Sequence, residues 1–340
     1  DFTGAFLSVL GLFSIVLGIL LGQVYGFWLA KQPFVIGPFE IAPFGLSITP
    51  FLIGFGILLI MLLFRWEKRQ EETGADGLFK PSLFSVPGLL PGFFVRSLQM
   101  GLTAAFLFTF PLLLQLTFEF TAMETGIALL PLSISVLVAA ILGARLTARF
   151  KAKRIIQAGF LLIIFGLGIV AATVKPDVQP SDLAYGVVFG LGIGLVTSQI
   201  LNLVFSSVDE KDTPETSGIN GTFEQLGNSI GVALVGTIMI GTLMMGLVVS
   251  IEESTEIPQE YKPELTAAVQ DGVQLVSDTQ LQEWLETSDA DDEVKAEIME
   301  IYADDRTQAF NAGIAFLIFI ALVGLISTVG LSDRKLVEDK

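Results

Sequence analysis

The sequence contains no cysteine and no histidine among its 340 residues. Disulfide bridges, thiol nucleophiles, common zinc sites and Ser-His-Asp triads are therefore excluded. The remaining candidates for catalysis are scattered acids without an obvious partner. We therefore expect no enzyme, no catalytic residue, no metal and no cofactor.

Charged residues are also scarce. They make up 16% of the chain, whereas 52% of the residues are apolar; soluble domains contain about 25% charged residues. A water-soluble protein of this size could not bury so much apolar surface. The formal net charge is nevertheless −16, so the location of the acids needs an explanation.

Long segments without Asp, Glu, Lys or Arg indicate membrane spans, because a charge at the bilayer centre costs about 2.5–3.5 kcal/mol on insertion scales. Eight such segments reach the length of about 20 residues that a spanning helix needs. They are too long and continuous for barrel strands. We therefore predict an all-α membrane protein with eight transmembrane helices. The segments are Phe2–Ala30, Ile41–Phe64, Ser97–Phe118, Thr125–Ala144, Ile155–Val174, Leu183–Val208, Gln225–Ile251 and Thr307–Ser332.

The distribution of Lys and Arg predicts the orientation. Fourteen bases fall on one side of the predicted spans and five on the other. We expect the richer side, and with it both ends of the chain, to be cytoplasmic. The richer side carries Arg65, Lys68, Arg69, Lys80, Arg96, Arg145, Arg149, Lys151, Lys153, Arg154, Lys211, Arg334, Lys335 and Lys340, and the other side Lys31, Lys175, Lys262, Lys295 and Arg306.

Two connecting segments are long. Residues 65–84 are polar and predict a cytoplasmic linker between a first helix pair (residues 1–64) and a six-helix bundle (residues 85–332), which a tail (residues 333–340) follows. Residues 252–306 form an insertion on the opposite, outer face, with 17 acids and three bases. This insertion accounts for nearly all of the net charge. Its apolar spacing predicts short amphipathic helices, either as a solvated cap or as a lid over an exit pathway.

The seventh predicted span carries a polar stripe. Asn220, Glu224 and Asn228 are spaced at i, i+4 and i+8, so they share one helix face. Gly227 and Gly231 form a GxxxG pair that predicts close contact with a neighbouring helix. Glu224 is the proton-coupling candidate, because an intramembrane carboxylate is a functional hypothesis by default. Alternatively, it reaches the cytoplasm or pairs with a base such as Arg96.

Amide side chains in the spans suggest a polar cavity between packed helices. Pro111 and Pro131 interrupt the third and fourth predicted spans, where they could bend the helices. The candidates for lining a substrate path are Gln115, Gln199, Asn202, Asn220, Gln225 and Asn228.

Three stretches resemble the major facilitator superfamily, and specifically its fourteen-helix drug:proton antiporters. One is LLLQLTFEFTAMETGIALLP, another runs from Gly190 to Thr237, and the third is GARLTARFKAKR, which is similar to the cytoplasmic loop motif. Gly143, Arg145 and Arg149 fit that motif as gate-loop residues. Ala148 stands where the motif usually has Asp, and Glu224 where the family often has Arg.

The resemblance implies a central helix pair followed by the C-terminal six-helix bundle of a transporter. An N-terminal six-helix bundle would then be missing from this sequence, and alternating access needs both bundles. The implied function is proton-coupled export of amphipathic or cationic small molecules from the plasma membrane, with no nucleic-acid partner. Two alternatives stay open, namely export of a lipid, siderophore or metabolite, and a non-transporting scaffold that binds partners through its acidic loop.

Overall fold

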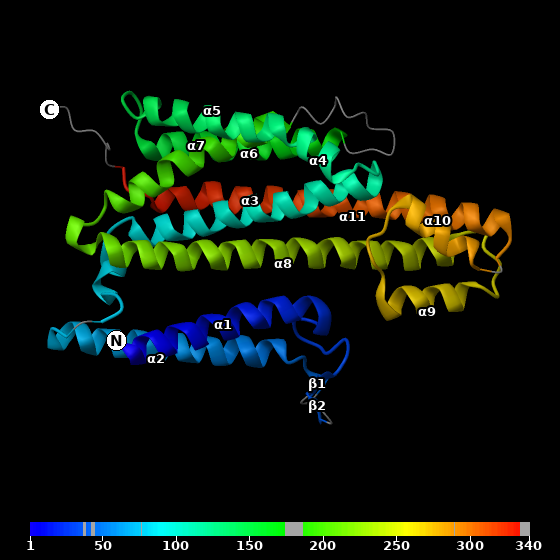
Figure 1. Ribbon diagram of the computed structural model, residues 1–340, viewed down its shortest axis with the longest axis horizontal. Coiled ribbons are helices and arrows are strands. Elements are labelled where there is room, and N and C mark those ends of the chain that lie inside the picture. Colours follow the sequence, from blue (N-terminus) through cyan, green and yellow to red (C-terminus); the bar gives the residue numbers. More distant parts are fainter. Residues whose placement is uncertain (37–38, 42–44, 76, 174–185, 289, 334–340) are drawn as a thin grey trace.

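The structure is a computed structural model that describes residues 1–36, 39–41, 45–75, 77–173, 186–288 and 290–333. In these ranges eight helices are long and apolar enough to cross a membrane, which confirms the predicted all-α membrane fold (Figure 1). The predicted tail beyond Asp333 and the predicted outer base Lys175 lie outside the described residues. The elements are α1 (Phe2–Tyr25), β1 (Phe34–Ile36), β2 (Phe39–Ile41), α2 (Thr49–Thr73), the 3-10 helix η2 (Pro81–Ser85), α3 (Leu89–Thr117), α4 (Ala122–Ala128), α5 (Leu130–Leu146), α6 (Ala152–Thr173), α7 (Gly186–Phe205), the 3-10 helix η4 (Glu210–Asp212), α8 (Thr213–Glu253), α9 (Lys262–Gly272), α10 (Asp278–Glu286), α11 (Asp292–Ser327) and the 3-10 helix η5 (Thr328–Gly330).

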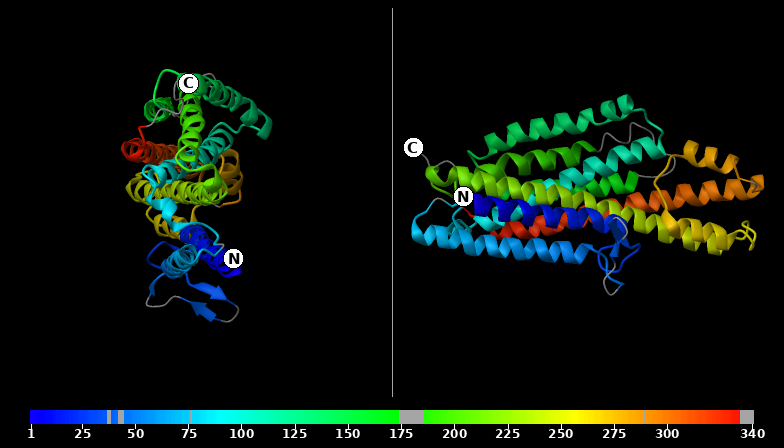
Figure 2. Two further views of the ribbon diagram at one scale, coloured as in Figure 1. Left: turned by 90° about the vertical axis from the view of Figure 1, so that its left-hand side faces the viewer. Right: turned by 60° about the horizontal axis from the view of Figure 1, so that its bottom comes forward.

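Helices α1 and α2 form an antiparallel pair on one side of the other helices (Figure 2). The uncharged segment predicted over Ile41–Phe64 begins too early, because strands β1 and β2 pair as a hairpin before the helix starts. Pro50 lies in the first turn of α2, where its missing N–H is tolerated. The helix then continues to Thr73, into the segment expected to be a linker, and ends at Gly74 with φ 69°. Charged residues can prolong a helix beyond the bilayer, so the end of an uncharged run does not mark the end of the helix.

The remaining spans form a bundle in which α7 packs between α5 and α6, and α8 packs against α3 and α11. Small residues allow these close approaches. A Cβ atom on Gly192 would lie 2.7 Å from the backbone nitrogen of Ile163 on α6, and one on Gly194 would lie 2.7 Å from the Cβ of Ala139 on α5. The core between these helices is built from buried Phe, Leu and Ile side chains such as Phe106.

The predicted GxxxG contact is confirmed. A Cβ atom on Gly227 would clash with the backbone oxygen of Ser97 on α3, and one on Gly231 would clash with the backbone of Gly101. The two helices therefore touch backbone to backbone over one turn, which only glycine permits at this spacing.

Pro131 lies in the first turn of α5, directly after the break between α4 and α5 at Leu129. The predicted interruption of the fourth span is therefore confirmed. Pro111 lies inside α3, which continues past it to Thr117. A proline removes one backbone hydrogen bond from a helix, and in α3 the surrounding bundle tolerates that loss.

Helices α8 and α11 are much longer than a bilayer needs. They contain 41 and 36 residues, or about 60 and 55 Å at 1.5 Å per residue, against a hydrocarbon core of about 30 Å. Their overhanging ends combine with α9 and α10 into an acidic cap, residues 252–306, at one end of the molecule (Figure 1). Short helices were predicted here; α9 and α10 match them, whereas the segment from Asp292 onward belongs to the last spanning helix.

The acidic cap contains an apolar cluster and an ion pair. Ile257 and Tyr302 of the cap pack against Leu247 and Ile251 of the adjoining part of α8. The guanidinium of Arg306, almost fully buried, lies 2.8 Å from the carboxylate of Asp278 and donates a hydrogen bond to a backbone carbonyl of the cap. The cap is thus a folded unit rather than a loose loop.

Candidate functional site

The polar stripe of α8 meets α3 at Glu224. Oε2 of Glu224 lies 2.9 Å from Nη2 of Arg96, so the Glu224 carboxylate forms an ion pair within the bundle. Pairing with Arg96 was expected as an alternative to the proton-coupling role of Glu224, and the structure shows this pairing. Asn220 is buried, with 7% of its surface exposed, and Asn228 is half-buried on the same face of α8.

Arg96 is also the first member of a hydrogen-bonded row along α3. Its Nη1 donates to Oε1 of Gln99 at 2.6 Å, and Nε2 of Gln99 donates to Oγ1 of Thr103 at 3.1 Å. The spacings of three and four residues place these side chains on one helix face. Gln99 and Thr103 were not predicted as candidates, although their spacing from Arg96 was the signal that could have identified them.

The glycine contact between α3 and α8 explains why Arg96 reaches Glu224. Gly227 lies less than one turn from Glu224, and its contact with Ser97 places Arg96 at the same level of the bundle. The side chain of Arg96 is 7% exposed and that of Glu224 is 27% exposed. An unpaired charge at the position of Arg96 would cost several kcal/mol, so Glu224 supplies the compensating charge. Neutralising either residue leaves the charge of the other without its partner.

Three buried polar atoms at the candidate residues have no hydrogen-bond partner within the described ranges. They are Nε of Arg96, Oε1 of Gln199 and Oδ1 of Asn220. Burying a polar group without a partner is unfavourable. Such atoms are therefore suited to receive a polar ligand group or water.

The two amide residues of α7 differ in their surroundings. Gln199 is fully buried and donates to Oγ of Ser198 at 3.1 Å. Asn202 is exposed and donates to the backbone carbonyl of the same serine. Only Gln199 is therefore enclosed by the bundle.

Two predicted lining residues lie away from the ion pair. Gln115 is exposed near the opposite end of α3, and 19 residues separate it from Arg96, which corresponds to about 28 Å along a helix. Gln225 is also exposed, because its position next to Glu224 turns it to another face of α8. The structure therefore does not bring these two amides together with Glu224.

Of the three predicted gate-loop residues, Gly143 and Arg145 lie in the last turn of α5 and Arg149 lies in the turn that follows. Gly143 is buried, and a Cβ atom there would clash with Oγ of Ser198 on α7. Arg145 and Arg149 are exposed. The loop is held by a base that was not singled out, since Nζ of Lys151 lies 2.7 Å from a carboxylate oxygen of Asp333 near the end of α11.

The connection between α2 and α3 is fastened to the start of α8. Nζ of Lys80 lies 2.6 Å from Oδ1 of Asp212 and 3.3 Å from Oε1 of Glu215. The hydrogen bonds to Asp212 and to Glu215 raise the pKa of Lys80 above its ordinary value. The first helix pair is thus tied to the same helix that carries Glu224.

An apolar cavity of about 370 Å³ lies between the helix pair and α8. Its walls include Leu12 of α1, Leu63 of α2, Phe79 of the connection and Phe223 of α8. Phe223 precedes Glu224 in the sequence. A volume of this size is in the range of small-molecule sites, and its lining suits an apolar compound.

Comparison with known protein families decides the identification. A family model described as Major Facilitator Superfamily matches residues 2–232, which is more than half of the chain. The chain belongs to the Major Facilitator Superfamily. The resemblance noted in the sequence is thereby confirmed at the level of the superfamily.

Curated members of the superfamily show similarity at low identity. A probable actinorhodin transporter of Streptomyces coelicolor is 26% identical over 55% of this chain. The multidrug transporter protein MdtP of Bacillus subtilis is 25% identical over 69% of the chain, and the puromycin resistance protein pur8 of Streptomyces alboniger is 26% identical over 55%.

The matched part covers 33%, 40% and 37% of these three relatives, respectively. The chain thus matches less than half the length of each of these three relatives. Together with the eight apolar helices, family membership shows that this is a multi-pass membrane protein.

Proposed function

We propose that this chain is the C-terminal part of a proton-coupled exporter of amphipathic or cationic small molecules. The complete exporter would include a further six-helix bundle and would reside in the plasma membrane, with both ends of this segment in the cytoplasm. The observation that carries the proposal is the ion pair between Arg96 and Glu224 inside a bundle of the Major Facilitator Superfamily. The multidrug and antibiotic-resistance relatives support the substrate class.

The ion pair provides a way to couple protons to conformation. Protonation of Glu224 would remove the charge that compensates Arg96, and a cationic substrate would compete with Arg96 for the same carboxylate. Either event weakens the contact between α3 and α8 at this level. A proton or substrate that binds one arrangement better than the other shifts the equilibrium between inward-open and outward-open states.

The remaining polar residues would then have graded roles. Asn220 and Gln199 are buried and each has an acceptor atom without a partner among the residues that the structure describes, which suits contact with a substrate or with water on the transport path. Asn228 extends the stripe by one turn. Arg145 and Arg149, exposed at the end of α5, would act in the gate between inward-open and outward-open states, where Gly143 allows α5 to pack on α7.

The test uses the complete exporter in proteoliposomes with an imposed pH gradient and the fluorescent lipophilic cation ethidium. We expect Glu224→Gln to lower gradient-driven efflux at least tenfold while the protein still inserts and elutes as a folded species. The matched control is Glu253→Gln, which makes the same chemical change at the exposed far end of α8 and should leave efflux unchanged.

Two results would count against the proposal. Proton coupling would be ruled out if the rate of efflux by the wild-type protein did not depend on the pH gradient. Full gradient-driven efflux by the Glu224→Gln variant would remove Glu224 from the coupling mechanism, whatever the exporter's substrate.

A further inference from the structure

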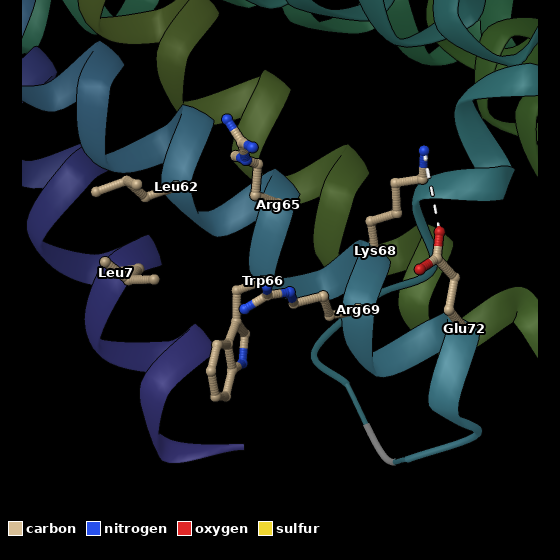
Figure 3. Close-up of a pocket in the computed structure, with 7 residues that line it drawn as sticks. All are labelled: Leu7, Leu62, Arg65, Trp66, Lys68, Arg69 and Glu72. Carbon is tan, nitrogen blue, oxygen red and sulfur yellow. Dashed lines mark ion pairs between the residues drawn. The ribbon is translucent and has the colours of Figure 1, made fainter.

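A groove of about 690 Å³ runs between α1 and α2 at the end of the pair where α2 becomes charged (Figure 3). Its apolar part is formed by Leu7 of α1 and Leu62 of α2. Its polar part comes from the next turns of α2. The polar lining residues are Arg65, Trp66, Lys68, Arg69 and Glu72.

Helix periodicity places these groups together. Leu62, Arg65, Trp66 and Arg69 follow one another at i, i+3, i+4 and i+7, so they share one face of α2. The face changes from apolar to cationic within one turn. A ligand that fits it must have an apolar portion and an anionic portion in contact with each other.

Within the described residues, the protein neutralises the cations of the groove only in part. Arg65, Lys68 and Arg69 are all exposed. Glu72 is the one carboxylate in the lining within the described part of the chain, and it lies 4.0 Å from Nζ of Lys68 with both side chains mostly exposed. Such surface pairs contribute little, so the groove keeps a net positive charge.

Three neighbouring acids have hydrogen-bond partners of their own, one of which is Trp66 in the wall of the groove. Asp1 caps the start of α1 and accepts a hydrogen bond from Nε1 of Trp66 at 2.9 Å. Glu67 is buried on another face of α2 and accepts a hydrogen bond from the backbone of Leu78. Glu71 accepts one from the backbone of Ser82. None of these carboxylates lines the groove.

A second groove of about 400 Å³ begins at the same arginine. Arg65 lines it together with Ile57, Ile60, Met61 and Phe64. This groove follows the uncharged part of α2 and is otherwise apolar. Arg65 therefore stands where a cationic surface meets an apolar channel that leads toward the membrane interior.

We propose that these two grooves together bind one anionic phospholipid. The phosphate lies among Arg65, Lys68 and Arg69, because arginine donates paired hydrogen bonds to phosphate, and an acyl chain lies along the apolar groove. Trp66 suits this level, since tryptophan is enriched at the membrane interface. Basic pockets at the cytoplasmic ends of spanning helices recognise anionic headgroups.

The test measures lipid retention by the complete protein in detergent, using native mass spectrometry. Phosphatidylglycerol and phosphatidylcholine are added in turn. We expect the protein to retain phosphatidylglycerol and not phosphatidylcholine. Since each base near a membrane surface contributes about fivefold in affinity, the variant Arg65→Gln/Lys68→Gln/Arg69→Gln should bind phosphatidylglycerol about 100-fold more weakly.

The matched control is Lys153→Gln/Arg154→Gln/Lys211→Gln, which removes the same charge from three positions outside both grooves and outside the proposed gate. It should retain phosphatidylglycerol as the wild type does. If the control variant lost as much phosphatidylglycerol as the groove variant, the proposed site would be overturned, because lipid binding would then depend only on the total charge of the protein.

The wild-type protein provides a test that needs no variant. Equal retention of the two lipids would overturn the proposal. Inorganic phosphate, compared with sodium chloride at the same ionic strength, should not displace phosphatidylglycerol. Full displacement by inorganic phosphate would show an anion site that does not need the acyl chain, and would equally overturn the proposed phospholipid.

Discussion

Gly231 on α8 is the position where one methyl group tests the contact between α8 and α3. A Cβ atom there would lie 2.7 Å from Cα and 2.8 Å from the carbonyl carbon of Gly101. Non-bonded carbon atoms prefer separations of about 3.5–4.0 Å, so the helices would have to move apart by at least about 0.8 Å. Both neighbouring atoms belong to the backbone and cannot rotate away as a side chain would.

The expected change in the free energy of unfolding on Gly231→Ala is the difference between two opposing effects. Overpacking of this kind costs about 1–3 kcal/mol, and alanine recovers about 1 kcal/mol of helix propensity relative to glycine. We therefore expect Gly231→Ala to lower the free energy of unfolding by up to about 2 kcal/mol. The ion pair between Arg96 and Glu224 should also lengthen, because it spans the same two helices.

The matched control is Gly221→Ala on the same helix. Among the described residues, no heavy atom outside its own helical surroundings lies within 4 Å of the Cβ position at Gly221. The change should therefore stabilise the protein by up to about 1 kcal/mol through helix propensity alone. Thermal and denaturant unfolding of the purified protein, followed by tryptophan fluorescence, measures both variants. The inferred backbone contact would be refuted if both variants changed the free energy of unfolding equally, or if Gly231→Ala stabilised the protein.

Two further predictions concern charged contacts. In a double-mutant cycle of Arg96→Gln and Glu224→Gln, each single change should destabilise the protein by about 2 kcal/mol, between the values for exposed and buried pairs. The double variant should lose about 1–2 kcal/mol less than the sum of the two; unfolding measurements that show strict additivity would contradict the pairing. At the cap, hydrogen bonds from the side chain and then the backbone of Thr279 lower the pKa of Glu119. The hydrogen bonds from Thr279 to ionised Glu119 hold α10 against the end of α3. Their stabilising contribution is complete above the ordinary pKa of glutamate and is lost as the pH falls through the lowered pKa of Glu119. Hydrogen exchange of α10, corrected for its intrinsic pH dependence, should therefore rise on acidification in the wild type and much less in Glu119→Gln; identical profiles would exclude this role of Glu119.

The number and type of the spans were readable from the sequence, whereas their limits were not. Uncharged segments identified all eight helices because the cost of placing a charge in lipid depends on the residue itself and little on its neighbours. Helix α2 nevertheless begins after Ile41 and ends after Phe64, and α11 begins well before Thr307. Hairpin pairing, proline in a first turn and continuation of a helix into water decide those limits, and none of them changes the number of charges.

The sequence predicted which polar residues of the candidate site share a helix face, but not which residues of other helices they contact. The spacing of Asn220, Glu224 and Asn228 placed them on one face of a helix. The sequence left open whether Glu224 pairs with Arg96, reaches the cytoplasm or stays unpaired in the membrane, because a partner on another helix depends on how the two helices are rotated against each other. For the same reason the sequence could not separate the enclosed Gln199 from the exposed Gln115.

The sequence by itself therefore determined that this protein is a helical membrane protein of the Major Facilitator Superfamily, with its acids concentrated in one insertion outside the apolar spans. The apolar spans and the position of the acids depend on composition and local periodicity, because each segment is partitioned into the bilayer largely by its own residues. Family membership follows instead from the sequence match to the family model. Only the tertiary structure decided that a glycine contact brings α3 against α8 and that Arg96 and Glu224 meet there. Contacts between distant segments depend on packing in three dimensions, where a single missing Cβ atom sets how closely two helices approach.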